Sequence, residues 1–208
     1  MKILSVEKPD NNTENCVIRI EGHEDLVILA ETYIKLCLYE KEDINEEEFD
    51  AILKAAQKEK ARTSATTLLS TRLRSSGEIR ERLLLEGFKE MTIEDVVNDL
   101  VDIGYINDRL FAAKYVHDRN RSKPRPQKIL KQELMAKGVD DEAIEEALYD
   151  YKQDDQMTAH SLVKRKYGKY DSTDEKILRR IFYFLRSRGY DENTIEAVVN
   201  EIKNGDPI

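Results

Sequence analysis

Residues 79–88, IRERLLLEGF, decide the fold of this chain, because the chain repeats their pattern three times. A step of 51 residues leads to Leu130, Leu134 and Gly138-Val139. The same step again leads to Ile181, Leu185 and Gly189-Tyr190. Apolar residues and a glycine that recur without slippage indicate an internal array of repeats.

Each copy predicts two helices separated by a glycine. In every copy two apolar residues lie four positions apart and therefore face one side of a helix. These pairs are Ile79 with Leu83, Leu130 with Leu134, and Ile181 with Leu185. The first helix of each pair should end at the glycine, because glycine takes the left-handed C-terminal conformation without a Cβ clash. The three glycines are Gly87, Gly138 and Gly189.

The start of the following helix differs between the copies. Asp140 and Asp191 have short acceptor side chains that suit an N-cap. The first copy has Lys89 at this place, so its helix is expected to begin at Thr92.

A further helix precedes each pair and repeats with a spacing of 47 residues. Its recurring small residue is Ala65, Ala112 and Ala159 in the three copies. Asn107-Asp108 and Asp154-Asp155 are candidate N-caps for the second and third copies. The two spacings differ by four residues, which fall in connections rich in Ser, Pro and Gly. One repeat is therefore three short helices.

The segment before the repeats has another pattern. Short apolar runs at 3–6, 16–20 and 26–30, separated by turn residues, predict a small antiparallel β element. Residues 31–38 look helical, with Ile34 and Leu38 on one face. Asn45 is a candidate N-cap. Residues 50–71 fit either one long helix or two helices with a break near Thr63-Ser64.

The expected fold is mainly α, with three tandem three-helix repeats forming an elongated array and a small N-terminal β element. The N-terminal segment with short β-strands is assigned to 1–45. Repeats 1, 2 and 3 are assigned to 46–106, 107–153 and 154–208.

Composition favours a helical, surface-rich protein over an enzyme with a large core. Of 208 residues, 37% are charged, 7% are aromatic and none is Trp. No signal-peptide core and no apolar run of the roughly eighteen residues of a membrane span is present, so we expect a cytoplasmic protein. Cys16 and Cys37 are expected to be reduced thiols. No motif proposes a catalytic residue, a metal or a cofactor.

Charge is segregated along the chain, although the net charge of −8 alone argues against nucleic-acid binding. Residues 1–60 hold eight basic and fifteen acidic residues. By contrast, 114–137 hold eight basic and two acidic residues, and 164–188 hold nine and three. The last helix of each repeat is acidic. Two accounts remain open: the charges solvate outer faces and pair within a repeat, or cations of successive repeats follow a phosphate backbone while acidic helices face a protein partner.

The second account names a candidate set of binding cations. They are Arg72, Arg74, Arg119, Arg121, Lys123, Arg125, Lys128, Lys131, Lys164, Arg165, Lys166, Arg179 and Arg180. Among the aromatic residues, Tyr105, Phe111 and Tyr115 are interpreted as core packing, with base stacking as the alternative. The run 182–184, Phe-Tyr-Phe, cannot face one core throughout, so at least one of its rings is a candidate for a partner surface.

Three segments of the chain carry motifs of a known family. They are 71–80 (TRLRSSGEIR), 104–112 (GYINDRLFA) and 129–139 (ILKQELMAKGV). In this order they resemble the RecX family of recombination regulators. The resemblance covers residues 60–150 well and the rest more loosely. The chain departs from the family before the second helix of the middle repeat, where Lys123-Pro124-Arg125-Pro126 replaces the usual Tyr-Gly-Pro or Lys-Gly-Pro turn. The loop stays basic, but two prolines stiffen it differently.

The resemblance implies a protein that binds the RecA recombinase filament and modulates, usually inhibits, its ATPase and strand-exchange activities. Such proteins lie in the filament groove, in contact with RecA and the single- or double-stranded DNA that it holds. We expect this protein to be a monomer. Two alternatives remain: a non-specific DNA-binding helical repeat protein that acts without a recombinase partner, and a protein-only scaffold.

Overall fold

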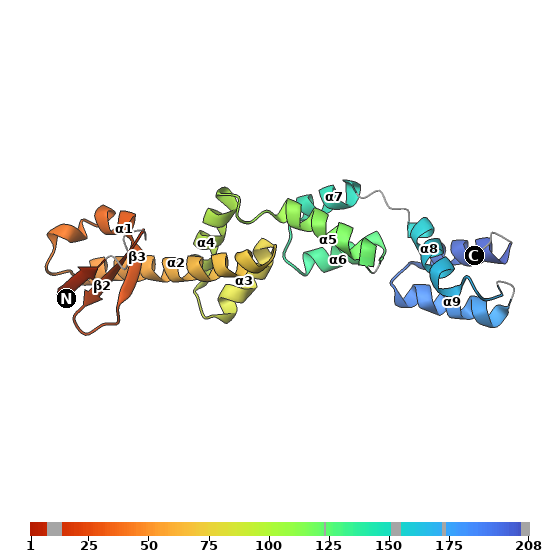
Figure 1. Cartoon of the computed structure of the whole chain (residues 1–208), viewed down its shortest axis with the longest axis horizontal. Coiled ribbons are helices and arrows are strands. Elements are labelled where there is room, and N and C mark those ends of the chain that lie inside the picture. Colours follow the sequence, from red (N-terminus) through yellow and green to blue (C-terminus); the bar gives the residue numbers. More distant parts are fainter. Residues whose placement is uncertain (8–13, 123, 151–154, 172–173, 205–208) are drawn as a thin grey trace. The chain divides into compact units, whose positions relative to one another are not determined.

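The computed structural model describes residues 1–7, 14–122, 124–150, 155–171 and 174–204 (Figure 1). The chain divides into two compact units, Met1–Ile106 and Asn107–Ile208. The first unit contains the N-terminal sheet and the first repeat, and the second unit contains the other two repeats. The predicted mainly helical fold with a small sheet is confirmed.

The N-terminal sheet has three antiparallel strands in the order β1-β2-β3. They are β1 (Ile3–Glu7), β2 (Asn15–Ile20) and β3 (Leu26–Leu29). Apolar residues alternate along β2, so one face of the sheet is buried. Ile18 and Ile20 of this face pack with Ile28 of β3 and with Ile52 from the following long helix. The predicted β element is confirmed.

The helix predicted over residues 31–38 is wrong in its second half. Helix α1 (Ala30–Lys35) ends early, and a 3₁₀ helix, η1 (Leu38–Glu40), follows. Cys37 between them has a left-handed backbone with φ of 50°. The break turns Leu38 into the core, where it is 2% exposed, and leaves Ile34 62% exposed.

Helix α2 (Glu46–Thr71) is one continuous helix, which decides between the two alternatives for this stretch. Asn45 is its N-cap, as predicted, and forms a capping box with Glu48. The polar stretch 62–67 is helical too, and its threonine hydroxyls find acceptors within the helix; Thr67, for example, donates to the Thr63 carbonyl at 2.8 Å. Ile52 joins the core under the sheet, whereas Ala65 joins the core of the first repeat.

The remaining helices form the three repeats. The first repeat continues with α3 (Ser76–Leu85) and α4 (Glu90–Asp102). The second consists of α5 (Asp108–Ser122), α6 (Gln127–Met135) and α7 (Asp141–Asp150). The third consists of α8 (Asp155–Tyr167), α9 (Glu175–Ser187) and α10 (Glu192–Lys203).

The prediction that a glycine ends the first helix of each pair is confirmed; we call these three residues the glycine stops. Gly87, Gly138 and Gly189 have φ of 88°, 69° and 91°. In each copy the amide of the next residue donates to the carbonyl five residues earlier, as Phe88 does to Leu83 at 3.2 Å. This bond defines the Schellman motif, and the conformation it needs explains the recurring glycine.

The helix starts agree with the prediction except in the first repeat. Asp140 and Asp191 accept from the backbone amides of Ala143 and Thr194, at 2.8 and 2.9 Å. The predicted start at Thr92 is wrong, because α4 begins at Glu90 with Lys89 as a cap that makes no side-chain bond. Burial of the apolar side of α4 outweighs a missing cap, which contributes only about 1 kcal/mol.

The N-cap prediction for the helices α5 and α8 is confirmed only for α5. Asn107 accepts from the Leu110 amide at 2.9 Å. Asp154 lies outside the described residues, and Asp155 is already the first residue of α8.

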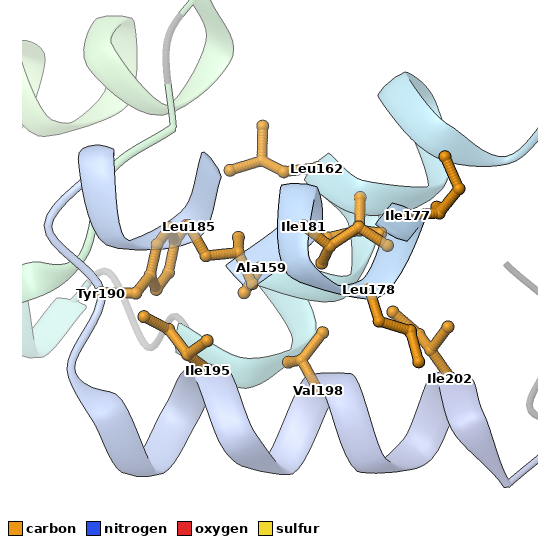
Figure 2. Packing of buried hydrophobic residues seen from close by; sticks show 11 residues of the cluster. Ala159, Leu162, Ile177, Leu178, Ile181, Leu185, Tyr190, Ile195, Val198 and Ile202 are labelled. Carbon is orange, nitrogen blue, oxygen red and sulfur yellow. The ribbon is translucent and has the colours of Figure 1, made fainter. Parts of the chain in front are cut away.

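Each repeat buries the predicted apolar pairs. Ile79, Leu83, Leu130, Leu134, Ile181 and Leu185 are all fully buried. In the third repeat, Ile195, Val198 and Ile202 of α10 point toward Leu178, Ile181 and Leu185 of α9 (Figure 2). A fully buried alanine of the preceding helix allows close approach, and Ala65, Ala112 and Ala159 hold this place in the three copies.

Candidate nucleic-acid interface

The two predicted cations of the first repeat are bound to their own chain. Arg72 donates through Nη1 to Oε2 of Glu78 at 2.9 Å and to the Leu73 carbonyl at 3.0 Å. Arg74 donates from Nε to the Leu68 carbonyl at 3.1 Å. Both side chains therefore hold the connection between α2 and α3.

Arg119 and Arg125 of the second repeat share one carboxylate, that of Glu133. Their Nε atoms lie 3.1 and 3.6 Å from its oxygens. The Tyr115 hydroxyl donates to Glu133 at 2.9 Å and accepts from Arg119 at 3.1 Å. The hydrogen bond to Tyr115 raises the pKa of Arg119, and burial raises the pKa of the Tyr115 hydroxyl. The network is half-buried, and through it the two arginines link α5 and the connection after it to Glu133 of α6.

An open groove of about 440 Å³ lies beside α6 and α7. It is lined by Gln127, Lys128, Lys131, Glu145, Leu148 and Tyr149. The Lys131 ammonium forms an ion pair with Glu145, which raises the Lys131 pKa. Lys128 is exposed and forms no ion pair among the described residues, so its charge faces solvent.

The other predicted cations of the second repeat differ in what the structure describes. Arg121 is exposed in the last turn of α5. Lys123 lies outside the described residues.

The predicted cations of the third repeat are exposed. Lys164, Arg165 and Lys166 stand in the last turn of α8, where cations interact favourably with the helix dipole. The Lys166 Nζ lies 4.0 Å from the centroid of the Phe184 ring. Arg179 and Arg180 are on α9, away from its buried side, and form no ion pair among the described residues.

The acidic helices are partly neutralised within their own repeats. Glu94 of α4 pairs with Arg80 at 2.8 Å, and Glu145 of α7 pairs with Lys131. These two pairs are equivalent, because each partner moves by 51 residues from one repeat to the next. Arg109 also pairs with α7, through Glu142 and Glu146. Pairing within a repeat thus accounts for much of the acidic charge of α4 and α7.

The acidic helix of the third repeat lacks this pairing. Phe182 stands where the other copies have Arg80 and Lys131, so it offers no cation to α10. Within the described part of the chain, Glu192 and Glu196 form no ion pair.

The aromatic predictions are resolved individually. Phe111 is 6% exposed, and its ring stacks on Tyr115 with centroids 6.0 Å apart, as core packing predicts. Tyr105 is 61% exposed and does not belong to a core. In the run 182–184, Tyr183 is 66% exposed, whereas both phenylalanines pack against the core of the third repeat.

The structure brings Arg119 and Arg125 together on Glu133. It also divides the predicted cations into those that contact their own chain and those that are exposed. Arg72, Arg74, Arg119, Arg125 and Lys131 are engaged by their own chain, whereas Arg121, Lys128, Lys164, Arg165, Arg179 and Arg180 are exposed without an ion pair in the ranges that the structure describes. The prediction omitted Lys176 and Arg186, which are exposed on α9. A step of 51 residues from Arg125 leads to Lys176, so the repeat register itself contained this signal.

Two further findings concern metal sites and membrane-spanning helices. Among the described residues, no three or more His, Cys, Asp or Glu side chains gather as a metal site would require. A search of the same residues finds no helix whose length and apolar character would suit a membrane span.

Models of the RecX family match the chain in all three repeats. The first, second and third three-helix domains of RecX match residues 61–100, 107–148 and 153–199. Among curated relatives, the regulatory protein RecX of Clostridium perfringens strain SM101 is 27% identical over 209 residues, covering 99% of this chain and 98% of that protein. The protein of the same name from Amycolatopsis mediterranei strain U-32 is 34% identical over 145 residues, covering 68% of this chain and 82% of that one.

Solved structures agree with the fold. A crystal structure of regulatory protein RecX aligns with a TM-score of 0.74 at 22% identity, covering 96% of this chain and 99% of the other. The crystal structure of RecX from Lactobacillus salivarius aligns with a TM-score of 0.62 at 25% identity, covering 73% of this chain and 99% of the other. The three matched domains and these relatives establish that the chain belongs to the RecX family of regulatory proteins.

Proposed function

We propose that this chain binds the RecA filament and lowers its ATPase and strand-exchange activities. Membership of a family of regulatory proteins supports a regulatory role. The observation that carries the proposal further is the uneven use of the predicted cations: Arg72 and Arg74 of the first repeat are bound to their own chain, and those of α8 and α9 stay exposed. A filament offers both protein and phosphate, which suits a chain with separate neutralised and cationic surfaces.

The proposal takes the chain to act in the cytoplasm as a monomer, on single- or double-stranded DNA held within the filament. The exposed cations, including Lys128, Lys164 and Arg165, would contact phosphate. Arg72 and Arg74 would instead hold the first repeat in shape, and Arg119 and Arg125 the second, through the contacts described above.

A titration of RecA's DNA-dependent ATPase with the purified chain tests the proposal. The expected result is a fall in ATPase rate that approaches completion near stoichiometry with RecA. Strand exchange measured in the same mixtures should fall over the same range. An unchanged ATPase rate and unchanged strand exchange would contradict the proposal.

Exposed cations also favour a second candidate, a DNA-binding protein that acts without a recombinase partner. Such a protein would lower the ATPase rate by removing DNA from RecA. Additional single-stranded DNA should then restore the rate. A chain that binds the filament would keep the rate low when DNA is in excess, so the two functions give opposite results.

A further inference from the structure

The outer face of α9 combines four cations with one exposed aromatic ring. The inner face of this helix buries Ile177, Leu178, Ile181 and Leu185. The opposite face exposes Lys176, Arg179, Arg180, Tyr183 and Arg186. Residues three and four apart are neighbours on a helix, so Arg179 and Arg180 flank Tyr183 on one side and Arg186 flanks it on the other. The ring of Tyr183, 66% exposed, therefore lies at the centre of a cationic surface.

The other two repeats show that packing does not require an aromatic ring at this place. A step of 51 residues relates Tyr183 to Gln132 and to Glu81, and all three side chains are exposed. The same step relates Arg186 to Met135 and Leu84. Equivalent helix faces are thus acidic and apolar in the first repeat and cationic and aromatic in the third. The fold alone does not explain the ring.

The cations on this face are available to a partner. None of the four forms an ion pair with any residue in the described ranges, and the only acidic residue of α9 is Glu175, in its first turn. In α3 and α6, by contrast, Arg80 and Lys131 pair with the acidic helix of their own repeat. Four cations in about three turns favour a polyanion over a single carboxylate.

We infer that the outer face of α9 binds single-stranded nucleic acid, with a base stacked on Tyr183 and phosphates held by Arg179, Arg180 and Arg186. The inference rests on the proposed function in taking DNA as a partner, but it assigns the contact to one helix and to an unpaired strand. An exposed ring can stack on a base only where the face of that base is free, as it is in a single strand. A duplex or an acidic protein would use the cations and leave the ring without a role.

A tryptophan at position 183 reports the stacking directly. The chain has no Trp of its own, so Tyr183→Trp introduces a single indole fluorophore. Titration with a thymidine oligonucleotide, without any recombinase, should quench its emission to a plateau. The same oligonucleotide annealed to its complement should quench it much less.

Binding of the same labelled oligonucleotide, followed by fluorescence anisotropy, separates the ring from the charges. Tyr183→Ala should weaken binding by about 5- to 150-fold, the effect of losing one stacked base. Tyr183→Phe should keep the affinity, and Tyr105→Ala, at a ring 61% exposed in the first unit, should not change it. Replacing both Arg179 and Arg180 by Ala should reduce the slope of log affinity against log salt by about 1.4.

Three results would overturn the inference. They are an unchanged affinity in Tyr183→Ala with an unchanged circular dichroism spectrum, duplex binding at least as tight as single-strand binding, and binding of polyglutamate in preference to the oligonucleotide. Since no recombinase is present, any of them would refute the assignment to α9 while the ATPase titration could still support regulation of RecA. Conversely, an unchanged ATPase rate would refute the regulation of RecA, while quenching of the Tyr183→Trp variant by the oligonucleotide could still support the assignment to α9.

Discussion

Arginines on one helix differ in what holds them, and this decides which of them a partner can use. Arg119 is tied to Glu133 and Tyr115 in a half-buried network. Arg121, two residues later on α5, is exposed and forms no ion pair among the described residues. A substitution at Arg119 therefore alters the fold's own contacts, whereas one at Arg121 alters only surface charge.

Arg119→Ala should lower the free energy of unfolding by about 1–3 kcal/mol, because Glu133 and Tyr115 lose a partner in a half-buried site. Arg121→Ala is the matched control and should stay within about 0.5 kcal/mol of the wild type. Urea unfolding followed by circular dichroism measures both. Equal effects of the two substitutions would show that the network does not contribute to stability.

The glycine stops offer a second test at the scale of single residues. Gly87→Ala should cost about 1–2 kcal/mol, because alanine is strained at φ of 88° but meets no atom within 4 Å. Gly189→Ala should cost more, because its Cβ would lie 2.6 Å from Cγ1 of Ile129. Thermal unfolding of both variants, with Ile129→Ala added to the second, tests this. If Ile129→Ala recovers none of the extra loss, the close approach is not its cause.

Asp191 links the stability of α10 to pH. Hydrogen bonds from the backbone amide and then the hydroxyl of Thr194 hold the pKa of this carboxyl below its ordinary value. A group whose pKa is lower in the folded state stabilises the fold above its unfolded pKa, about 3.9 for Asp. That contribution is lost as pH falls through the lower folded pKa.

Asp191→Asn keeps the cap acceptor and removes the titration. The wild type should be more stable than this variant by about 0.3–1 kcal/mol at neutral pH, through the interaction of the charge with the helix N-terminus. The advantage should disappear in acid. Urea midpoints measured from pH 7 down to pH 2 follow the difference, and a constant difference would contradict the assignment.

At the scale of elements, the three repeats differ in the residue that caps the last helix. The caps of α7 and α10 are aspartates that accept from the amide three residues later, but the cap of α4 is Lys89. The backbone of Lys89, with φ of −72° and ψ of 144°, is already in the extended conformation of a cap. Only the acceptor side chain is missing.

Lys89→Asp should therefore stabilise the chain by about 0.5–2 kcal/mol, by supplying an acceptor to the first turn of α4 and replacing a cation at its positive end. Lys89→Ala is the control, which removes the cation without adding the acceptor. Denaturant midpoints of both variants distinguish the contribution of the new acceptor from that of removing the cation. A Lys89→Asp variant no more stable than Lys89→Ala would show that the first turn cannot use the acceptor.

The repeats could be predicted from sequence because a period of 51 residues and a glycine stop are local signals. The break at Cys37 could not, because a left-handed cysteine has no strong local signal and Leu38 enters the core through contacts with distant residues. The same holds for the candidate site. The sequence shows the charge run 114–137, but only the folded structure shows that Arg119 and Arg125 converge on Glu133. The limits assigned to the repeats stay a prediction.

At the scale of the whole molecule, the three repeats share a pattern of helices and differ in their surfaces. The first and second repeats partly neutralise their acidic helices internally, and the third leaves cations and a ring exposed on α9. A regulatory RecX chain built in this way would present different chemistry from successive modules of one fold. A filament offers phosphate from its nucleic acid and a different surface from its protein. A chain that binds both therefore needs a cationic surface and a separate, more neutral one.

Sedimentation with RecA filaments tests the central claim most directly. Filaments are assembled on single-stranded DNA with a slowly hydrolysed ATP analogue, and the salt is raised until the chain no longer sediments with the DNA alone. The account predicts that the chain still sediments with the filaments at this salt. A chain that stays in the supernatant with RecA filaments would contradict it.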